Sequence, residues 1–485
     1  MMRSIYSRMA AICLVLLMAP SLASAQADRF ELGQHLRACE SAWDSQPDMA
    51  ARKRAVEHLK QSVTLFFSLK LSEAGRELDQ ARFALKSSTP ASGEEQWAES
   101  IYVRPDSRFI DSSHVELPFS VMQMYQVSNG TPGKASIRLS LILNGKTTVK
   151  PQSFEISTIP MTGVIKTGKL KDGDYALRAE VVSGKIVLSS SEQVISISSN
   201  LTSRIEKIKT SLESMNTKES STDIETAKNL LGTLTALSQK QSLETNYNAN
   251  RILNDAEALI KAVNENREFF DNRRIGQFWL SLKTGSGSVP VRMMIPQTAG
   301  KGAPLPLVIA MHGAGGSENL FFDGYGRGVI SMLSERRGWL LVAPRGSSGF
   351  TPGRAAEIID AVNRLYPVDR KKVFIVGHSM GASQAVATVQ QTPEIFAAVA
   401  ALGGGGNVKK ESKIQDVPFY IGVGSDDFAL PNARKLESGL RDSGVKSVRM
   451  REYDGVEHLV IVQEALPEVF RFFDEIITGL RNTSK

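Results

Sequence analysis

The sequence predicts an α/β domain with a mostly parallel sheet at the carboxyl-terminal end of a multidomain chain. From residue 275 onward, short apolar segments alternate with helical segments, which is the pattern of α/β domains. Several of these segments, such as PLVIAMHG and KVFIVGHS, are continuous apolar runs, as expected for strands covered on both faces. The chain has 485 residues, which is more than one compact core accommodates, so further domains are expected upstream.

Residues 1–25 have the pattern of a secretory signal peptide. Two arginines precede the apolar run AAICLVLLMAPSLA, and a small-residue cleavage site ends at Ala25. This predicts a secreted or periplasmic protein with no integral membrane segment after cleavage. Removal of the leader leaves Cys39 as the only thiol, so no intramolecular disulfide is expected.

Three regions are predicted between the leader and the α/β domain. Residues 26–90 have helical periodicity. Residues 99–199 contain short alternating runs separated by Asn-Gly and Asp-Gly turn signals, which predicts an immunoglobulin-like or fibronectin-like β-sandwich. Residues 201–272 return to helical periodicity and are expected to form two or three helices. The α/β domain itself is predicted over residues 275–480.

Composition favours a folded protein and argues against a nucleic-acid partner. Hydrophobic residues make up 42% and charged residues 22% of the chain, which are ordinary values for a globular protein. The net charge is +7, but no dense basic run alternates with aromatic residues. The sequence leaves the oligomeric state open.

The segment GHSMG, residues 377–381, carries the candidate nucleophile. It directly follows the apolar strand KVFIV and directly precedes SQAVATVQQ, which is typical of a helix. Ser379 is therefore predicted on a sharp strand-to-helix turn, where small flanking residues are a steric requirement. The start of a helix also favours developing negative charge.

A serine hydroxyl needs a base to act as a nucleophile, and histidine has a suitable pKa. His458 is the only histidine that follows Ser379 in the chain. It lies in YDGVEHL, after the last predicted strand and before a phenylalanine-rich helix. This is the place where a loop carries the base in a fold with the chain order serine, acid, histidine.

The loop after the strand PFYIGVG supplies two candidates for the acid that orients the histidine, Asp426 and Asp427. Asp427 is preferred because it lies three residues after the strand-ending Gly424, with Pro431 one turn later. Asp426 is the alternative acid, and it could instead cap the following helix.

Backbone N–H groups are expected to stabilise the oxyanion of an acyl-transfer reaction. One is the N–H of Met380, directly after the serine, and others are expected from Gly313 and Ala314 in the loop HGAGG. The chain lacks the glycine-rich motifs of nucleotide-binding loops, so no cofactor is expected, and no metal either.

At this point the carboxyl-terminal part resembles the α/β-hydrolase superfamily. MHGAGGSEN, APRG, YPVDRKKVFIVGHSMGA and the terminal VEH resemble secreted esterases related to feruloyl esterases and polyhydroxybutyrate depolymerases. More distantly they resemble the dienelactone hydrolases and the catalytic domains of prolyl oligopeptidases. Many such esterases have two glycines after the methionine of the serine motif, where this chain has Gly381 and Ala382. The resemblance does not cover the first 270 or so residues.

The resemblance implies a catalytic triad of Ser379, Asp427 and His458, with an oxyanion hole from Met380, Gly313 and Ala314. The expected activity is that of a carboxylesterase-type serine hydrolase acting on a small-molecule or polymeric ester. A prolyl-oligopeptidase-like peptidase or amidase is the alternative within enzymes, and a non-catalytic binding or scaffold protein is the alternative of another class. The sequence does not identify the ester. The α/β domain is expected to lack a substantial lid and to keep its activity when the chain starts near Ile275.

Overall fold

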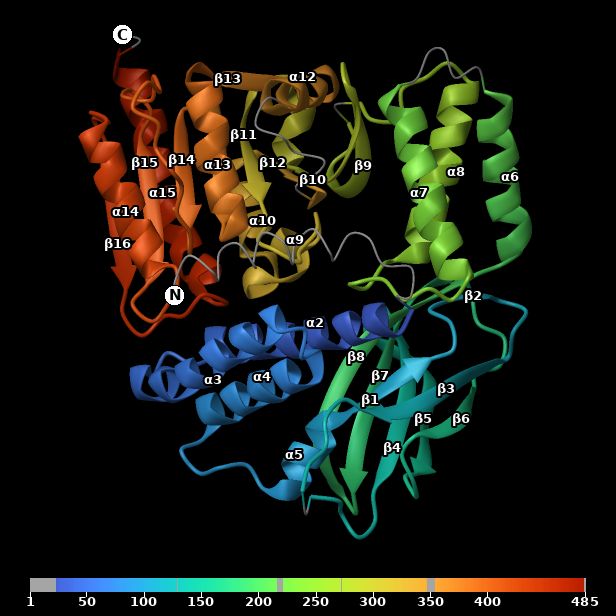
Figure 1. The fold of residues 1–485 in the computed structure, drawn as a ribbon. Coiled ribbons are helices and arrows are strands. Elements are labelled where there is room, and N and C mark those ends of the chain that lie inside the picture. Colours follow the sequence, from blue (N-terminus) through green and yellow to red (C-terminus); the bar gives the residue numbers. More distant parts are fainter. Residues whose placement is uncertain (1–22, 129, 216–220, 272, 347–353, 484–485) are drawn as a thin grey trace. The chain divides into compact units, whose positions relative to one another are not determined.

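A computed structural model describes residues 23–128, 130–215, 221–271, 273–346 and 354–483 (Figure 1). The chain forms two compact units, each built from several stretches of sequence. Unit 1 comprises residues 1–36, 64–217 and 227–261, and unit 2 comprises residues 37–63, 218–226 and 262–485, as far as these are described. The predicted signal peptide lies outside the described residues except for its last three positions.

This division differs from the predicted domain bounds. The predicted helical regions 26–90 and 201–272 are each divided between the two units. Four helices contribute residues to both units: α2 (Ala23–Asp44), α3 (Met49–Phe67), α7 (Thr222–Ser238) and α8 (Ala249–Asn264). Helical periodicity shows that a helix has a face to bury, but it does not show which core buries that face.

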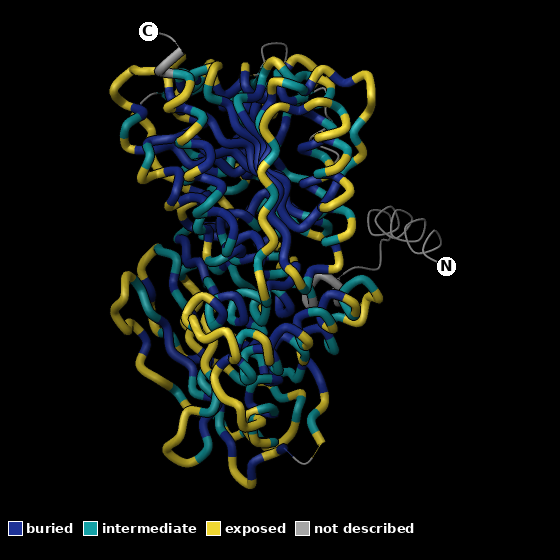
Figure 2. Tube along the Cα trace, turned by 90° about the vertical axis from the view of Figure 1, so that its left-hand side faces the viewer, coloured by how far each residue is buried: buried dark blue, intermediate teal, exposed yellow. Residues whose placement is uncertain are grey.

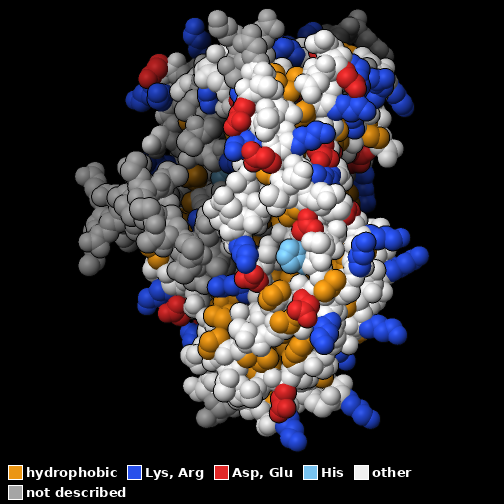
Figure 3. Space-filling model, turned by 90° about the vertical axis from the view of Figure 1, so that its right-hand side faces the viewer, with side chains coloured by type: hydrophobic (Ala, Val, Ile, Leu, Met, Phe, Trp, Pro, Cys, Tyr) orange, Lys and Arg blue, Asp and Glu red, His pale blue; other side chains and the backbone are white. Residues whose placement is uncertain are grey.

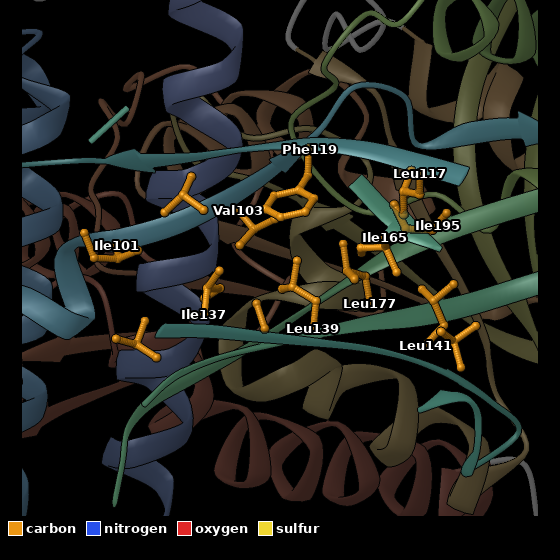
Figure 4. Packing of buried hydrophobic residues seen from close by; sticks show 14 of the residues in the cluster. Ile101, Val103, Leu117, Phe119, Ile137, Leu139, Leu141, Ile165, Leu177 and Ile195 are labelled. Atoms are coloured by element: carbon orange, nitrogen blue, oxygen red, sulfur yellow. The ribbon is translucent and has the colours of Figure 1, made fainter. Parts of the chain in front are cut away.

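The described residues of unit 1 form two sheets whose buried side chains share one core. The sheets have the strand orders β1-β3-β6 and β2-β8-β7-β4-β5. Their bounds are β1 (Ile101–Pro105), β2 (Phe109–Asp111), β3 (Glu116–Gln123), β4 (Ser136–Leu143), β5 (Lys146–Glu155), β6 (Met161–Lys166), β7 (Gly173–Ser183) and β8 (Ile186–Ser198). Figure 4 shows Phe119 and Val103 from the smaller sheet opposite Leu139 and Leu177 from the larger one.

The other helices of unit 1 are α4 (Leu71–Lys86), α5 (Gly93–Ser100) and α6 (Leu201–Ser214). Helix α5 begins with a capping box. The Ser92 hydroxyl accepts a hydrogen bond from the Glu95 N–H, and the Glu95 carboxylate accepts one from the Ser92 N–H. This arrangement satisfies two N–H groups that have no partner inside the helix.

Unit 2 is built around a sheet whose strand order, among the described residues, is β16-β15-β14-β13-β11-β12-β10-β9. Strands β11 to β16 pair in parallel with their neighbours in this set. Strand β10 pairs antiparallel with both β12 and β9. The bounds are β9 (Gly276–Thr284), β10 (Gly287–Ile295), β11 (Leu305–Met311), β12 (Leu340–Pro344), β13 (Val368–His378), β14 (Ala398–Leu402), β15 (Phe419–Gly424) and β16 (Val448–Tyr453). Every residue of β12, β14 and β15 is buried. Figure 2 shows a bundle of buried, dark blue segments in the upper part of the trace. Both faces of the sheet are therefore covered.

Among the described residues, the helices that lie wholly within unit 2 alternate with the strands of this sheet along the chain. They are α9 (Leu320–Asp323), α10 (Tyr325–Arg337), α12 (Ala355–Leu365), α13 (Met380–Gln391), α14 (Leu430–Asp442) and α15 (Ile461–Thr483), with short 3₁₀ turns at Gln297–Lys301 and Pro393–Ile395. Helix α13 packs on β11, β13 and β14, and α15 packs on α10 and on β13 to β15. Aromatic stacking joins α15 to the sheet, with the rings of Phe374 and Phe473 4.4 Å apart.

The surface shown in Figure 3 carries charges of both signs. On this face, Lys and Arg side chains are interspersed with Asp and Glu side chains. Among the residues that the structure describes, no helix is long and apolar enough to cross a membrane.

Candidate active site

Ser379 lies on the turn between β13 and α13. Strand β13 ends at His378, helix α13 begins at Met380, and Ser379 between them has φ 54° and ψ −116°. A positive φ is unfavourable for a residue with a side chain, and such strain is characteristic of a nucleophile turn. The Ser379 N–H donates to the Leu402 carbonyl at 2.9 Å, which ties the turn to the end of β14. Ser379 is thus held, partly exposed, at the carboxyl end of the sheet.

The two glycines of GHSMG are required by close backbone contacts. A Cβ atom on Gly377 would lie 2.1 Å from the carbonyl oxygen of Gly381. A Cβ atom on Gly381 would lie 2.1 Å from the carbonyl oxygen of Met311, at the end of β11. Any side chain at either position would force strand and helix apart. The spacing of the motif therefore has a steric cause in this fold.

His458 and Asp427 form a buried pair. The Nδ1 atom of His458 lies 2.9 Å from Oδ1 of Asp427, and the two side chains are 5% and 0% exposed. The same Oδ1 accepts a hydrogen bond from the Ala429 N–H at 2.8 Å, which fixes the carboxylate. With Nδ1–H donating to the carboxylate, Nε2 of His458 is the acceptor nitrogen. Such a nitrogen is what a general base requires.

The charges around His458 favour its protonated form. Burial alone would lower the pKa of His458, but the charge and hydrogen bond of Asp427 and the charge of Glu457 together outweigh this effect, and the pKa lies above its ordinary value. Glu457 is also buried, and burial raises its pKa to about 7. When ionised, Glu457 further raises the pKa of His458. Glu457 lies in the motif YDGVEHL, but no pattern in the sequence assigns it a role.

The two aspartates of the predicted acid doublet have different partners. Asp426 Oδ1 accepts a hydrogen bond from Lys60 Nζ at 2.7 Å, and this contact lowers the pKa of Asp426. Asp427 pairs with His458. Lys60 belongs to α3, so a residue far upstream in the sequence contacts the loop that holds the candidate acid. The sequence carries no local signal for this contact, because 366 residues separate the two side chains.

Tyr325 connects the predicted oxyanion loop to the histidine that precedes the serine. Its hydroxyl oxygen lies 2.6 Å from Nδ1 of His378, and it accepts a hydrogen bond from the Gly313 N–H at 3.4 Å. His378 Nε2 lies 3.2 Å from the carbonyl oxygen of His458. In the tautomer that satisfies both contacts, Nε2–H of His378 donates to this carbonyl and Nδ1 accepts from the Tyr325 hydroxyl. Tyr325 could not be predicted as a site residue, because DGYGRG matches no catalytic motif.

The loop HGAGG lies beside the serine turn. A Cβ atom on Gly313 would be 3.3 Å from Cβ of Ser379, so the two backbones approach closely. His312 anchors the loop, with Nδ1 2.8 Å from the Gly313 carbonyl and Nε2 accepting the Gly346 N–H at 3.0 Å. Of the three predicted oxyanion donors, Gly313 directs its N–H to Tyr325. Ala314 is partly exposed next to it, and Met380 begins α13, where an N–H has no partner within the helix.

An exposed aromatic residue covers the histidine. The ring of Phe428 lies 4.3 Å from the ring of His458, and Phe428 is 49% exposed. The centre of the His378 ring also lies 4.7 Å from the centre of the His458 ring. The described residues contain no group of three or more His, Cys, Asp or Glu side chains that could hold a metal ion.

A cavity of about 510 Å³ lies elsewhere in unit 2. It is lined by residues at the start of β9, the end of β10 and on α10, among them Ile275, Met294 and Ser331. None of the predicted site residues lines this cavity.

The sheet order and the serine turn together define unit 2 as an α/β-hydrolase fold, which confirms the predicted fold class for the carboxyl-terminal domain. Residues 341–466 match the sequence model of the Dienelactone hydrolase family. The matched segment includes GHSMG, both aspartates of the acid doublet and His458.

Solved structures similar to this chain are esterases and related hydrolases. A ferulic acid esterase is 18% identical, with 42% of this chain and 99% of that chain covered and a TM-score of 0.36. The S-formylglutathione hydrolase of Staphylococcus aureus is 13% identical, with 41% and 99% covered and a TM-score of 0.35. The feruloyl esterase module of Clostridium thermocellum, in complex with sinapinate, is 14% identical, with 42% and 86% covered and a TM-score of 0.35. No curated protein matches the chain significantly.

Proposed function

We propose that this protein is a serine hydrolase that cleaves carboxylic ester bonds through an acyl-enzyme on Ser379. The observation that carries the proposal is the buried pair of His458 and Asp427, whose imidazole ring lies 4.7 Å from the ring of His378, the residue directly before the strained Ser379. In this scheme Ser379 is the nucleophile, His458 is the general base and Asp427 orients the histidine. Backbone strain at the serine, together with a buried histidine–aspartate pair, favours a catalytic role over a non-catalytic scaffold.

The contact of His458 Nδ1 with Asp427 supports the following reaction, because it leaves Nε2 to take a proton. Nε2 of His458 takes the proton of the Ser379 hydroxyl as Oγ attacks the ester carbonyl carbon. The resulting imidazolium is stabilised by Asp427, and it then gives the proton to the departing alcohol as the ester C–O bond breaks. Water, activated in turn by His458, attacks the acyl-enzyme and releases the acid and free Ser379. No redox step or cofactor enters this sequence.

The tetrahedral oxyanion is stabilised by backbone N–H groups. We assign Met380 and Ala314 as the donors and place Gly313, whose N–H is directed to Tyr325, in support of the loop. Met380 is the first residue of α13, so the partial positive charge of that helix end also acts on the oxyanion.

An ester is favoured over an amide as the substrate. The family that matches residues 341–466 is named for dienelactones, which are cyclic esters. A prolyl-oligopeptidase-like peptidase remains the competing proposal, because the same triad cleaves amides. Export of the chain, inferred from residues 1–25, is part of the proposal as well.

A fluorophosphonate probe on the full chain tests the nucleophile. We expect labelling at Ser379 in the wild type, none in Ser379→Ala, and hydrolysis at least roughly 10³-fold slower in that variant. Ser383→Ala is the matched control, because Ser383 lies one turn further along α13 and its hydroxyl donates to the Gly405 carbonyl. Labelling at another residue, or none on folded protein, would overturn the proposal.

A substrate panel separates the two enzyme classes. Aryl, feruloyl, acetyl-sugar and polyester substrates are compared with anilides of the same acyl groups. Faster hydrolysis of the esters than of the matched anilides is expected, whereas a preference for anilides or peptides would favour the peptidase.

A further inference from the structure

A left-handed turn lies directly behind the candidate site. Tyr325, Gly326, Arg327 and Gly328 have φ values of 47°, 71°, 55° and 72°, so four successive residues are left-handed. Glycine adopts this conformation readily, but Tyr325 and Arg327 do so at a cost. A turn of this kind persists only where its surroundings hold it, and such strain is concentrated at functional sites.

The group that holds this turn comes from α2. Glu40 is 1% exposed, and its Oε1 accepts a hydrogen bond from the Tyr325 N–H at 3.1 Å. The Glu40 carbonyl accepts a further bond from the Gln463 side chain on α15. Residues 37–63 belong to unit 2, so this contact is internal to the unit that contains Ser379. A carboxyl group that accepts the first N–H of the turn satisfies a donor that would otherwise be buried and unpaired.

The turn places the Tyr325 hydroxyl between the two halves of the candidate site. On one side the hydroxyl accepts a hydrogen bond from the N–H of Gly313, the residue directly before Ala314. On the other side it donates to His378, which in turn donates to the His458 carbonyl. Tyr325 is 4% exposed, and its ring packs edge-on against His378 and Phe321. One hydroxyl thus fixes both the oxyanion loop and the backbone of the base.

We propose that Tyr325 is a positioning residue for the acyl-transfer reaction, and that Glu40 of α2 holds Tyr325 in its left-handed conformation. This inference rests on the proposed function of Ser379 and His458. The hydroxyl never touches substrate, and it acts by setting the position of the Ala314 N–H and the His458 ring. When the hydroxyl no longer fixes these two positions, the chemical step slows, because the oxyanion donors and the base must lie within a fraction of an ångström of their productive positions.

Tyr325→Phe is the first test, since it removes the hydroxyl and keeps the ring packing. We expect kcat for an aryl ester, and the rate of fluorophosphonate labelling of Ser379, to fall roughly 10-fold to 100-fold with little change in KM. Tyr366→Phe is the matched control. It removes another buried hydroxyl, one that donates to the Arg274 carbonyl near the opposite end of β13, and it should leave kcat unchanged.

Glu40 is tested with two variants. Glu40→Gln keeps an oxygen that accepts the Tyr325 N–H, and it should retain kcat within about 3-fold of the wild type. Burial raises the pKa of Glu40 to about 8, so the carboxyl is largely neutral at pH 7 and glutamine imitates it closely. Glu40→Ala removes the acceptor, and we expect it to lower kcat and the labelling rate as Tyr325→Phe does, again with little change in KM.

Each outcome bears on one of the two proposals. If the wild type is not labelled at Ser379, the proposed function fails and this inference fails with it. If the wild type is labelled but Tyr325→Phe and Glu40→Ala keep the wild-type kcat, the proposed function stands and the positioning role is overturned. If either variant lowers the melting temperature as Tyr366→Phe does, with kcat per folded molecule unchanged, the role is structural and the inference is likewise overturned.

Discussion

At the scale of single residues, the acid doublet shows what the sequence leaves open and what the fold decides. Asp426 and Asp427 are adjacent, and the position of a strand-ending glycine favoured the second as the acid. In the structure, the Asp427 side chain contacts His458 and the Asp426 side chain accepts a hydrogen bond from Lys60. The contact between Asp426 and Lys60 could not be predicted, because helical periodicity does not show where the helix that carries Lys60 packs.

Substitution of each aspartate by asparagine separates the two roles. Asp427→Asn should lower kcat by roughly 10⁴-fold, because an amide favours the wrong tautomer of His458 and cannot stabilise the imidazolium. Asp426→Asn should change kcat little and reduce stability by about 1 kcal/mol or less, because its pair with Lys60 is partly exposed. Kinetics of ester hydrolysis and thermal melts check both, and the reverse ranking would assign the acid to Asp426.

The buried carboxyl of Glu457 gives a prediction for the pH profile. The reaction needs neutral His458, so kcat/KM should rise with pH through a pKa above the ordinary value of 6.5. An ionised Glu457 raises this pKa, so Glu457→Gln should move the rising limb to lower pH. The amide oxygen can still accept the Leu459 N–H, as Glu457 Oε2 does at 2.7 Å. A control on α15, Glu475→Gln, should leave the limb in place, and an unshifted or raised limb in Glu457→Gln would contradict the prediction.

At the scale of elements, the strands were predictable because each is defined by its own residues. Runs such as KVFIVGHS and PFYIGVG are long enough and apolar enough to specify strands covered on both faces. The steric need for glycine at 377 and 381 is local as well, which explains why GHSMG predicted the serine turn. The left-handed turn at Tyr325 was not predictable, because two of its four residues are not glycines and Glu40 supports it from 285 positions away.

At the scale of the whole molecule, the boundary at residue 275 stays a prediction, and the compact unit that contains Ser379 has other bounds. Unit 2 includes residues 37–63, which lie far upstream of that boundary. Trp43 is fully buried, and its Nε1–H donates to Glu464 of α15 at 2.7 Å. Helical periodicity in this segment gave no sign that its partners follow more than 400 residues later.

These contacts predict that residues 275–485 alone do not form a fully active hydrolase, contrary to the expectation from sequence. The fragment lacks the carboxyl group of Glu40 and the indole of Trp43, so it leaves the Tyr325 N–H and the Glu464 carboxylate without these partners. We expect a low melting temperature and slow fluorophosphonate labelling of Ser379. Co-expression with residues 26–274 should restore labelling by supplying the missing helices, whereas the same partner carrying Trp43→Ala should restore it less. A fragment labelled by itself at the rate of the full chain would show that the upstream helices contribute nothing to the site, as the sequence first indicated.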